Sequence, residues 1–190
     1  MKPVFLIGYM GCGKTTLGEV LARQMGLSFI DLDEYIERKQ GATIVEIFDK
    51  RGEKRFRELE TAALCDVAAM CDVIVGCGGG TPCHGDNMAL MNQAGTTVWL
   101  TTSPERITAR LLLPEQKVKR PKFANLPDEA FLPLVKRELE TRTPYYSQAR
   151  LQFDSTDIET GPATERTARR LAIFLRPHLE TGNDVPKTRN

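Results

Sequence analysis

The sequence predicts a three-layer, doubly wound α/β sandwich, in which helices cover both faces of a five-stranded parallel sheet. Short apolar runs alternate along the chain with longer segments in which apolar residues recur at helical spacing. The runs Val4–Ile7 and Val73–Val75 contain no polar residue, which is typical of parallel strands buried on both faces. A glycine follows each of these runs directly. Strands that alternate with helices in this way indicate βαβ units built around a parallel sheet.

The first unit contains the motif G-x-x-x-x-G-K-[ST], which spans Gly8–Thr15 between the strand Val4–Ile7 and an amphipathic segment over Thr16–Met25. Glycines allow positive φ angles, and backbone N–H groups at the start of a helix bind phosphate oxygens. Lys14 is expected on the β- and γ-phosphates, and the Thr15 hydroxyl on Mg²⁺. A plain turn is the alternative, but the Lys-Thr pair in this context favours a phosphate loop. The nucleotide is therefore expected to bind to Gly11, Cys12, Gly13, Lys14, Thr15 and Thr16.

Composition bounds the class of protein. A chain of 190 residues, with 27% charged and 41% hydrophobic residues, is typical of one globular domain, expected here over 1–180. The net charge of +1 gives no reason to expect nucleic acid or a membrane as a partner. Its five cysteines are odd in number and lack paired spacing, which indicates reduced thiols in a cytoplasmic protein. No apolar segment is long enough to span a membrane.

A second strand is expected over Leu27–Ile30, after a C-cap at Gly26, and it leads to Asp31 and Asp33. If the strand continues through both carboxylates, they point the same way. Either one can instead cap the helix expected over Glu34–Gln40, which Gly41 is expected to end. Strand ends beside a phosphate loop are where ligands bind in open α/β sheets, so at least one aspartate is expected on the substrate or on the water shell of the metal.

Two helices are expected next. Thr43 and Glu46 indicate a capping box for a short helix that ends near Gly52, and a long amphipathic helix begins at Glu53. Arg57 and Glu60 lie three residues apart on this second helix and share a face. From the residues alone, a surface ion pair is the favoured interpretation.

The third strand, Asp72–Cys77, ends in Gly78, Gly79 and Gly80. Chain reversal alone could explain these glycines, but at the carboxyl end of a buried strand they favour a loop whose backbone approaches a ligand. His84 beyond them is interpreted as a loop or cap residue. A helix from about Asp86 to Gln93 and a fourth strand over Thr97–Thr101 follow.

Ser103 is expected to cap a helix through about Leu112. The segment 113–127 has no apolar period and is predicted to be a mobile lid, although its charges could simply be solvated. Its basic residues are Lys117, Lys119, Arg120 and Lys122. A helix capped by Asp128 is expected to end near Arg142, which could complement the helix dipole. The remaining elements expected are a strand over 151–154, a helix over 162–179 and a disordered tail over 181–190.

Together, these motifs resemble the shikimate kinase family over roughly residues 3–175. The motifs that carry the resemblance occur in the same order, and they are the phosphate loop, Asp31-Leu32-Asp33, Phe56-Arg57-Glu58-Leu59-Glu60, Gly78-Gly79-Gly80, Lys119-Arg120-Pro121 and Arg142-Thr143-Pro144-Tyr145-Tyr146. The resemblance implies the fold of nucleoside monophosphate kinases. It also implies that ATP and Mg²⁺ are used to phosphorylate the 3-hydroxyl of shikimate, on the route to chorismate and aromatic amino acids.

The resemblance also implies roles for individual residues. Asp33 resembles the aspartate that holds the ring hydroxyls and is a candidate base, within a substrate-binding region over about 33–60. Arg57 and Arg142 resemble the pair that binds the shikimate carboxylate. By the same resemblance, Glu60 orients Arg57, and Gly78, Gly79 and Gly80 form the wall of the substrate pocket. Arg120 contacts the transferring phosphate, Arg110 stacks on adenine, and Asp31 fixes a water on Mg²⁺. Lys14, Asp33 and Arg120 are thus the expected catalytic residues.

Two departures and two alternatives stand beside the resemblance. Cys12 places a thiol inside the phosphate loop, where its oxidation would block ATP. No arginine lies between Asp154 and Pro162 to contact a purine. The alternatives are another small-molecule kinase of the same fold, for gluconate, adenylate or adenylyl sulfate, and a module that binds ATP without turnover. A monomer is expected, because no large apolar helix face is left over.

Overall fold

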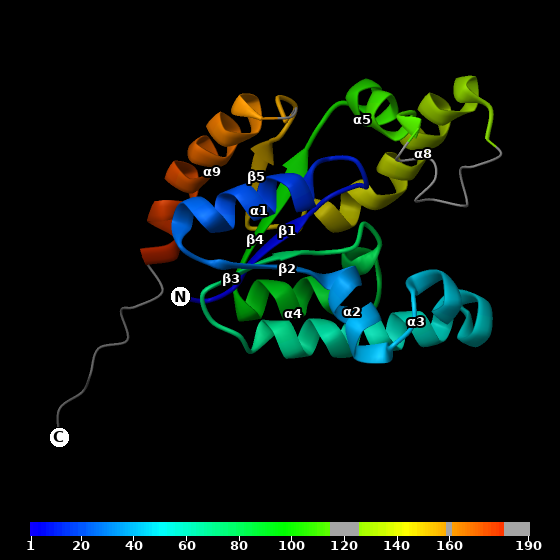
Figure 1. Ribbon diagram of the computed structural model, residues 1–190, viewed down its shortest axis with the longest axis horizontal. Coiled ribbons are helices and arrows are strands. Elements are labelled where there is room, and N and C mark those ends of the chain that lie inside the picture. The colour runs from blue at the N-terminus through cyan, green and yellow to red at the C-terminus, as the bar shows by residue number, and fades with distance from the viewer. Residues whose placement is uncertain (115–125, 159–160, 181–190) are drawn as a thin grey trace.

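The computed structural model describes residues 1–114, 126–158 and 161–180. Its five strands form one sheet in the order β2-β3-β1-β4-β5, and each neighbouring pair is parallel (Figure 1). The predicted five-stranded parallel sheet is therefore confirmed. The strands are β1 (Val4–Ile7), β2 (Ser28–Asp31), β3 (Val73–Gly76), β4 (Thr96–Thr101) and β5 (Leu151–Asp154).

Helices cover both faces of the sheet and give the three predicted layers. They are α1 (Lys14–Met25), α2 (Leu32–Gln40), α3 (Ile44–Ala68), α4 (Asn87–Ala94), α5 (Pro104–Leu111), α8 (Asp128–Tyr146) and α9 (Pro162–Glu180), with a short 3₁₀ helix η1 (Thr81–Cys83). α1 and α9 lie together on one face, and α3 and α4 lie on the other (Figure 1). Val4 and Leu6 of β1 point into one core, and Phe5 and Ile7 into the other. Both cores bury apolar side chains of the same strand, as a doubly covered parallel sheet requires.

β1 lies in the middle of the sheet, between β3 and β4. The strand order reverses at this point, and in open α/β sheets the crevice beyond the carboxyl ends of such strands is where ligands bind. The phosphate loop follows β1, Asp31 ends β2, and Gly78 and Gly79 follow β3. The topology therefore brings these three predicted ligand-binding segments to one edge of the sheet.

Capping chemistry sets several helix boundaries where the sequence predicts them. Gly26 and Gly41 end α1 and α2 with left-handed backbone, at φ values of 69° and 61°. Thr43 and Glu46 form the predicted capping box of α3. α3 is interrupted at Gly52, whose φ of 76° and ψ of 167° are not helical. The expected break between a short and a long helix is thus confirmed.

The strand does not continue through both carboxylates, because β2 ends at Asp31 and α2 begins at Leu32, before its expected start at Glu34. Two predictions for α8 are wrong. Asp128 lies in the first turn of α8 and does not cap it. α8 also continues past Arg142, through Pro144, to Tyr146.

Packing explains the longer α8. Pro144 removes one backbone donor, but Ser147 N–H still donates to the Thr143 carbonyl at 2.9 Å. Tyr146 is fully buried, and its ring lies 5.9 Å from the Trp99 ring, measured between centroids. The buried tyrosine stabilises a last turn that local propensity disfavours.

Two predicted segments lie outside the described residues. Residues 115–125, which include Arg120 and most of the predicted lid, form one of them, and the predicted tail 181–190 forms the other. Within the described part of the chain, no helix combines the length and apolar character needed to cross a membrane.

Candidate active site

The phosphate loop has the backbone that its glycines were expected to provide. Gly8, Gly11 and Gly13 adopt φ values of 139°, 78° and 97°, a region that side chains with a Cβ disfavour. Space is restricted as well, because a Cβ on Gly8 would lie 2.7 Å from the Leu100 carbonyl oxygen. A Cβ on Gly13 would lie 2.7 Å from Cδ1 of Ile158. Both conformation and packing therefore require glycine in this loop.

Lys14 opens α1 and reaches back across the loop. Its Nζ donates to the carbonyl oxygens of Gly8 at 2.8 Å and Tyr9 at 3.1 Å, and lies 3.8 Å from Sγ of Cys12. The Cys12 thiol is buried in the core. The backbone N–H of Cys12 donates to the Tyr9 carbonyl oxygen at 3.2 Å. Thr16 is exposed in the first turn of α1. The loop thus holds an ammonium group beside the α1 N-terminus, as a site for phosphate requires.

One carboxylate oxygen of Asp31 caps α2, and the other contacts the phosphate loop. Oδ1 caps α2 by accepting from the N–H groups of Asp33 at 3.0 Å and Glu34 at 3.4 Å. Oδ2 accepts from the Thr15 hydroxyl at 2.9 Å. A hydroxyl and a carboxylate beside a phosphate loop are the hard oxygen donors that suit Mg²⁺. Thr15, and Asp31 through water, therefore fit this metal.

Asp33 faces the Gly78 loop from the first turn of α2. A Cβ placed on Gly78 would lie 3.0 Å from Asp33 Oδ1 and 3.2 Å from Glu60 Oε1. Burial first, and then the negative charges of Asp31 and Glu60, raise the pKa of Asp33 from 3.8 to about 6 against the opposing charge of Lys14. Asp33 is thus a carboxylate that titrates close to neutral pH, as a proton acceptor needs to do.

The Arg57–Glu60 pair is not on the surface, so the interpretation favoured by the residues alone is wrong. Arg57 Nη1 donates to Glu60 Oε2 at 2.8 Å, and the Glu60 side chain is only 1% exposed. The other edge of the guanidinium donates to Glu53 Oε1, from Nη2 at 3.2 Å and Nε at 3.4 Å. Glu53 is mostly exposed, so this second pair faces solvent. A buried carboxylate therefore orients Arg57 toward the crevice.

Arg142 approaches the same loop from α8. Its Nη2 donates to Glu138 Oε2 at 2.5 Å, and its guanidinium carbon lies 5.1 Å from the centroid of the Tyr9 ring. A Cβ on Gly79 would lie 3.5 Å from Arg142 Nη1. Tyr146, one turn later, donates its hydroxyl to the Gly79 carbonyl at 2.6 Å. Burial raises the pKa of Tyr146, so its phenol remains a donor.

The three glycines after β3 bring the predicted substrate residues together. Gly78 faces Asp33, Gly79 faces Arg142, and Gly80 faces Arg57, whose Nη1 and Nη2 would both lie 3.1 Å from a Cβ on this glycine. A Cβ on Gly79 would also lie 3.4 Å from the backbone nitrogen of Met10, in the phosphate loop. Two guanidinium groups and a carboxylate therefore surround one loop, directly beside the expected phosphate site.

Arg110 lies apart from this group, on the far side of the phosphate loop. Its Nη1 donates to the Gly11 carbonyl at 2.9 Å, and its Nη2 donates to Thr156 at 3.0 Å and Ile158 at 2.6 Å. The segment after β5 contains no arginine of its own, but α5 supplies one to it. This contact depends on the packing of α5 near β5 and could not be predicted from the segment itself.

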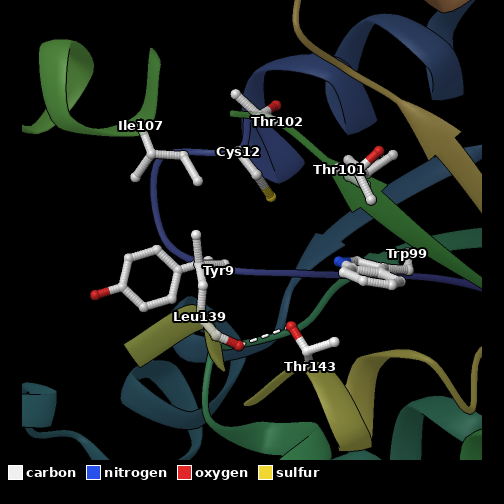
Figure 2. Close-up of a pocket in the computed structure, with 9 residues that line it drawn as sticks. Tyr9, Cys12, Trp99, Thr101, Thr102, Ile107, Leu139 and Thr143 are labelled. Carbon is white, nitrogen blue, oxygen red and sulfur yellow. Dashed lines mark hydrogen bonds between the residues drawn. The ribbon is translucent and has the colours of Figure 1, made fainter. Parts of the chain in front are cut away.

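A cavity of about 160 Å³ lies next to the phosphate loop (Figure 2). Tyr9 and Cys12 line it from the loop, and Trp99 lines it from β4. Ile107 of α5 and Thr143 of α8 close it on the other sides. The cavity contains none of the predicted substrate residues, so it does not enlarge the acceptor site.

Sequence reasoning missed three side chains of the site. Tyr146 holds Gly79, Tyr9 lies beneath Arg142, and Thr81 donates its hydroxyl to Glu60 Oε1 at 2.6 Å. Both tyrosines lie inside recognised motifs, the phosphate loop and the segment Arg142–Tyr146, but as buried aromatic residues they gave no signal of a role of their own. Thr81 follows the three glycines directly, and this position was the only indication in the sequence that it belongs to the site.

Together, these features define a class of protein. A phosphate loop with Lys14 and Thr15 stands at the switch point of a parallel sheet, and a second loop beside it presents Arg57, Arg142 and Asp33. A site of this composition belongs to a P-loop kinase with a small-molecule acceptor.

Comparisons with known proteins identify the family within this class. The family model named "Shikimate kinase" matches residues 10–173. A shikimate kinase of Bacteroides fragilis is 42% identical over 179 residues, which cover 94% of this chain and 99% of the relative. The crystal structure of shikimate kinase from Bacteroides thetaiotaomicron superposes with a TM-score of 0.87 at 40% identity, and covers 92% of this chain and 98% of the other. The chain belongs to the shikimate kinase family.

A further solved relative is in complex with shikimate. Shikimate kinase from Acinetobacter baumannii, in complex with shikimate, has a TM-score of 0.77 and 32% identity, with 94% of this chain and 96% of the other covered. The likeness extends over nearly the whole of both chains, and therefore includes the sheet edge at which the candidate site lies.

Proposed function

We propose that the chain transfers the γ-phosphoryl group of ATP to the 3-hydroxyl of shikimate, which yields shikimate 3-phosphate and ADP. The observation that carries the proposal is the loop Gly78–Gly80, which gathers Asp33, Arg57 and Arg142 beside the phosphate loop. Membership of the shikimate kinase family, and the shikimate bound by the Acinetobacter baumannii relative, support it. The reaction belongs to the biosynthesis of chorismate and aromatic amino acids.

The proposed acceptor matches the chemistry of the site. A carboxylate is best bound by the planar, bidentate guanidinium groups of arginine, and Arg57 and Arg142 present two of them. The hydroxyl groups of shikimate need acceptors, and Asp33 supplies a carboxylate at the same loop. The acceptor oxygen forms a bond to the γ-phosphorus as the bond to the β-phosphate oxygen breaks. Asp33 orients the attacking hydroxyl and accepts its proton.

Most of the catalytic effect is assigned to positioning and charge stabilisation, as is usual in phosphoryl transfer. Lys14 would bind the β- and γ-phosphates, the Thr15 hydroxyl would hold Mg²⁺, and Asp31 would accept from a water bound to the metal. Bound Mg²⁺ supplies positive charge against the phosphates. Arg120 is proposed to contact the transferring phosphoryl group, and Arg110 to stack on adenine.

We also propose that the enzyme acts as a monomer in the cytoplasm. The large apolar side chains exposed in the described residues lie on different elements, among them Val45 on α3, Leu113 after α5 and Ile173 on α9. The five cysteines are free thiols. A single sedimenting species of about 21 kDa would agree with the mass of 21.3 kDa for one chain.

The test is a coupled assay of ADP release, with Mg·ATP and shikimate, gluconate or AMP as acceptor. We expect turnover with shikimate alone, and we expect Asp33→Asn to lower kcat by ~10²-fold or more, because a positioned proton acceptor contributes about this much. Turnover with gluconate or AMP instead would overturn the roles of Arg57 and Arg142. No turnover with any acceptor would favour a module that binds ATP without catalysis.

A further inference from the structure

Glu60 carries a buried charge that needs more than one partner. Its side chain is 1% exposed, and a buried carboxylate is costly unless it is both paired and hydrogen-bonded. Arg57 satisfies Oε2 at 2.8 Å. The partner of Oε1 is the hydroxyl of Thr81, at 2.6 Å. The orientation of Arg57 therefore depends on a carboxylate that a threonine holds on its other side.

Thr81 is itself held by two backbone hydrogen bonds. Its backbone N–H donates to the Gly78 carbonyl at 3.1 Å, and its carbonyl accepts from Asn87 Nδ2 at 2.9 Å. Asn87 in turn accepts from the hydroxyl of Thr61 at 3.0 Å. Thr61 is the neighbour of Glu60 on α3, so the contacts form a closed ring between α3, η1 and α4. Thr81 and Asn87 are both fully buried, which limits the freedom of this ring.

The ring fixes the glycine loop relative to Arg57. Thr81 follows Gly80 directly, and Gly80 is the residue on which the guanidinium of Arg57 packs. A Cβ on Gly78 would lie 3.0 Å from both Thr81 Oγ1 and Asp33 Oδ1. One hydroxyl thus connects the arginine on α3 to the loop that also contacts Asp33.

We propose that Thr81 is a positioning residue for the acceptor site. Its hydroxyl holds Glu60, and Glu60 in turn holds Arg57 in the geometry that binds the substrate carboxylate. This inference rests on the proposed function, because it assigns the carboxylate of the acceptor to Arg57. Thr81 touches neither nucleotide nor transferring phosphate in this assignment. Its loss therefore affects acceptor binding and leaves ATP binding unchanged.

The test separates these two effects in steady-state kinetics. Thr81→Val removes the hydroxyl and keeps the shape, and we expect it to raise the KM for shikimate about tenfold, because a buried charge loses a donor. The KM for ATP should stay within about twofold, and kcat should change little, since the lost interaction is made equally in the ground and transition states. Thr81→Ser restores the hydroxyl and should restore the KM for shikimate.

A matched control removes another buried threonine hydroxyl. Thr97 is fully buried in β4, and its hydroxyl accepts from the Arg150 N–H at 2.8 Å, near the end of the strand opposite the site. Thr97→Val should lower stability without changing the KM for shikimate. If Thr81→Val does not fold, Thr81→Ala removes the same hydroxyl donor and places no methyl group in its position. Thermal unfolding of each variant shows whether a kinetic change merely follows stability.

A double-mutant cycle with Glu60→Gln tests the route of the effect. If Thr81 acts through Glu60, Thr81→Val should raise the KM for shikimate less in the Glu60→Gln background than in the wild type. An unchanged KM in Thr81→Val, an equal rise in the KM for ATP, or full additivity in the cycle would overturn the inference while the proposed function stands. Absence of wild-type turnover with shikimate would overturn both.

Discussion

Asp33 has an environment that should be visible in the pH dependence of catalysis. Its pKa of about 6 results first from burial and then from the charges of Asp31 and Glu60. Only the ionised carboxylate accepts a hydrogen bond and a proton from the substrate hydroxyl. We therefore expect kcat/KM for shikimate to fall as the pH drops below about 6, with a slope that corresponds to one proton, because kcat/KM reports groups of the enzyme form to which shikimate binds.

The measurement is a series of kcat/KM values between pH 5 and pH 8, at saturating ATP. The matching profile of kcat/KM for ATP, at saturating shikimate, shows whether the titrating group belongs to the acceptor site. A profile for shikimate that is flat across this range would contradict the assignment of Asp33 as the group that must be ionised.

Arg57 and Arg142 lead to a second prediction, because lysine preserves the charge but not the bidentate geometry. Arg57→Lys and Arg142→Lys should each raise the KM for shikimate by about tenfold or more, while the KM for ATP stays within about twofold. Arg55→Lys is a matched control, since Arg55 lies on the same helix and is about half exposed, in a pair with Glu58 at 2.7 Å. Equal effects in all three variants would argue against a carboxylate clamp.

At the scale of residues, the sequence was most informative where chemistry is local. The spacing of Gly8, Gly13, Lys14 and Thr15 predicted the phosphate loop because each residue meets a requirement of its own backbone position. The burial of Glu60 could not be predicted in this way. It depends on Thr81, which lies 21 residues away in sequence and approaches only when β3 has paired in the sheet.

Helices show the same division between local and distant causes. Gly26, Gly41 and the Thr43–Glu46 capping box marked boundaries correctly, because a cap involves only adjacent turns. The end of α8 was placed too early, because Pro144 is a local signal for termination. Packing of Tyr146 against Trp99 outweighs that signal, and this contact depends on where β4 lies.

The α1–β2 contact leads to a prediction in which two local effects oppose each other. Alanine in place of Gly18 should favour the helix by about 1 kcal/mol through propensity. A Cβ on Gly18 would, however, lie 2.3 Å from Cε2 of Phe29, whose ring also lies 3.1 Å from a Cβ position on Gly76. Because the ring already lies against both glycines, we expect overpacking to dominate. We expect Gly18→Ala to lower the free energy of unfolding by about 1–2 kcal/mol.

Urea denaturation measures this difference directly. Glu19→Ala is the control on the same helix, because Glu19 is exposed and its replacement should change stability by less than about 0.5 kcal/mol. An increase in the stability of Gly18→Ala would mean that Phe29 finds room elsewhere.

At the scale of the whole molecule, the layers were predictable but the strand order was not. Alternating strands and helices predict a parallel sheet from connection length and handedness alone. Nothing in the sequence of β3 states that it lies between β2 and β1, yet this order places the Gly78–Gly80 loop between Asp33 and the phosphate loop. The resemblance to a family implied this arrangement, and the residues alone did not.

The stability of the whole molecule should also depend on Asp33, with a sign opposite to that of most carboxylates. Its pKa is raised from 3.8 to about 6, so the folded state binds the proton more tightly than the unfolded state. The resulting stabilisation is complete below about pH 3.8 and is lost as the pH rises through about 6. Asn cannot ionise, so Asp33→Asn should gain stability relative to the wild type as the pH rises.

Free energies of unfolding in urea, measured at pH 4 and pH 7.5 for both proteins, test this expectation. The rise in the pKa of Asp33 from 3.8 to about 6 corresponds to at most about 3 kcal/mol of stability at pH 7.5. The difference in the free energy of unfolding between Asp33→Asn and the wild type should be small at pH 4. Asp49→Asn, at an exposed aspartate of α3, controls for the exchange of carboxylate for amide. If the difference in the free energy of unfolding does not grow with pH, or grows equally in the control, the ionised Asp33 carboxylate does not destabilise the folded protein. If the free energy of unfolding rises with pH relative to the wild type in Asp33→Asn alone, and this variant also loses turnover, then the ionised carboxylate that the acceptor site needs lowers the stability of the protein at neutral pH.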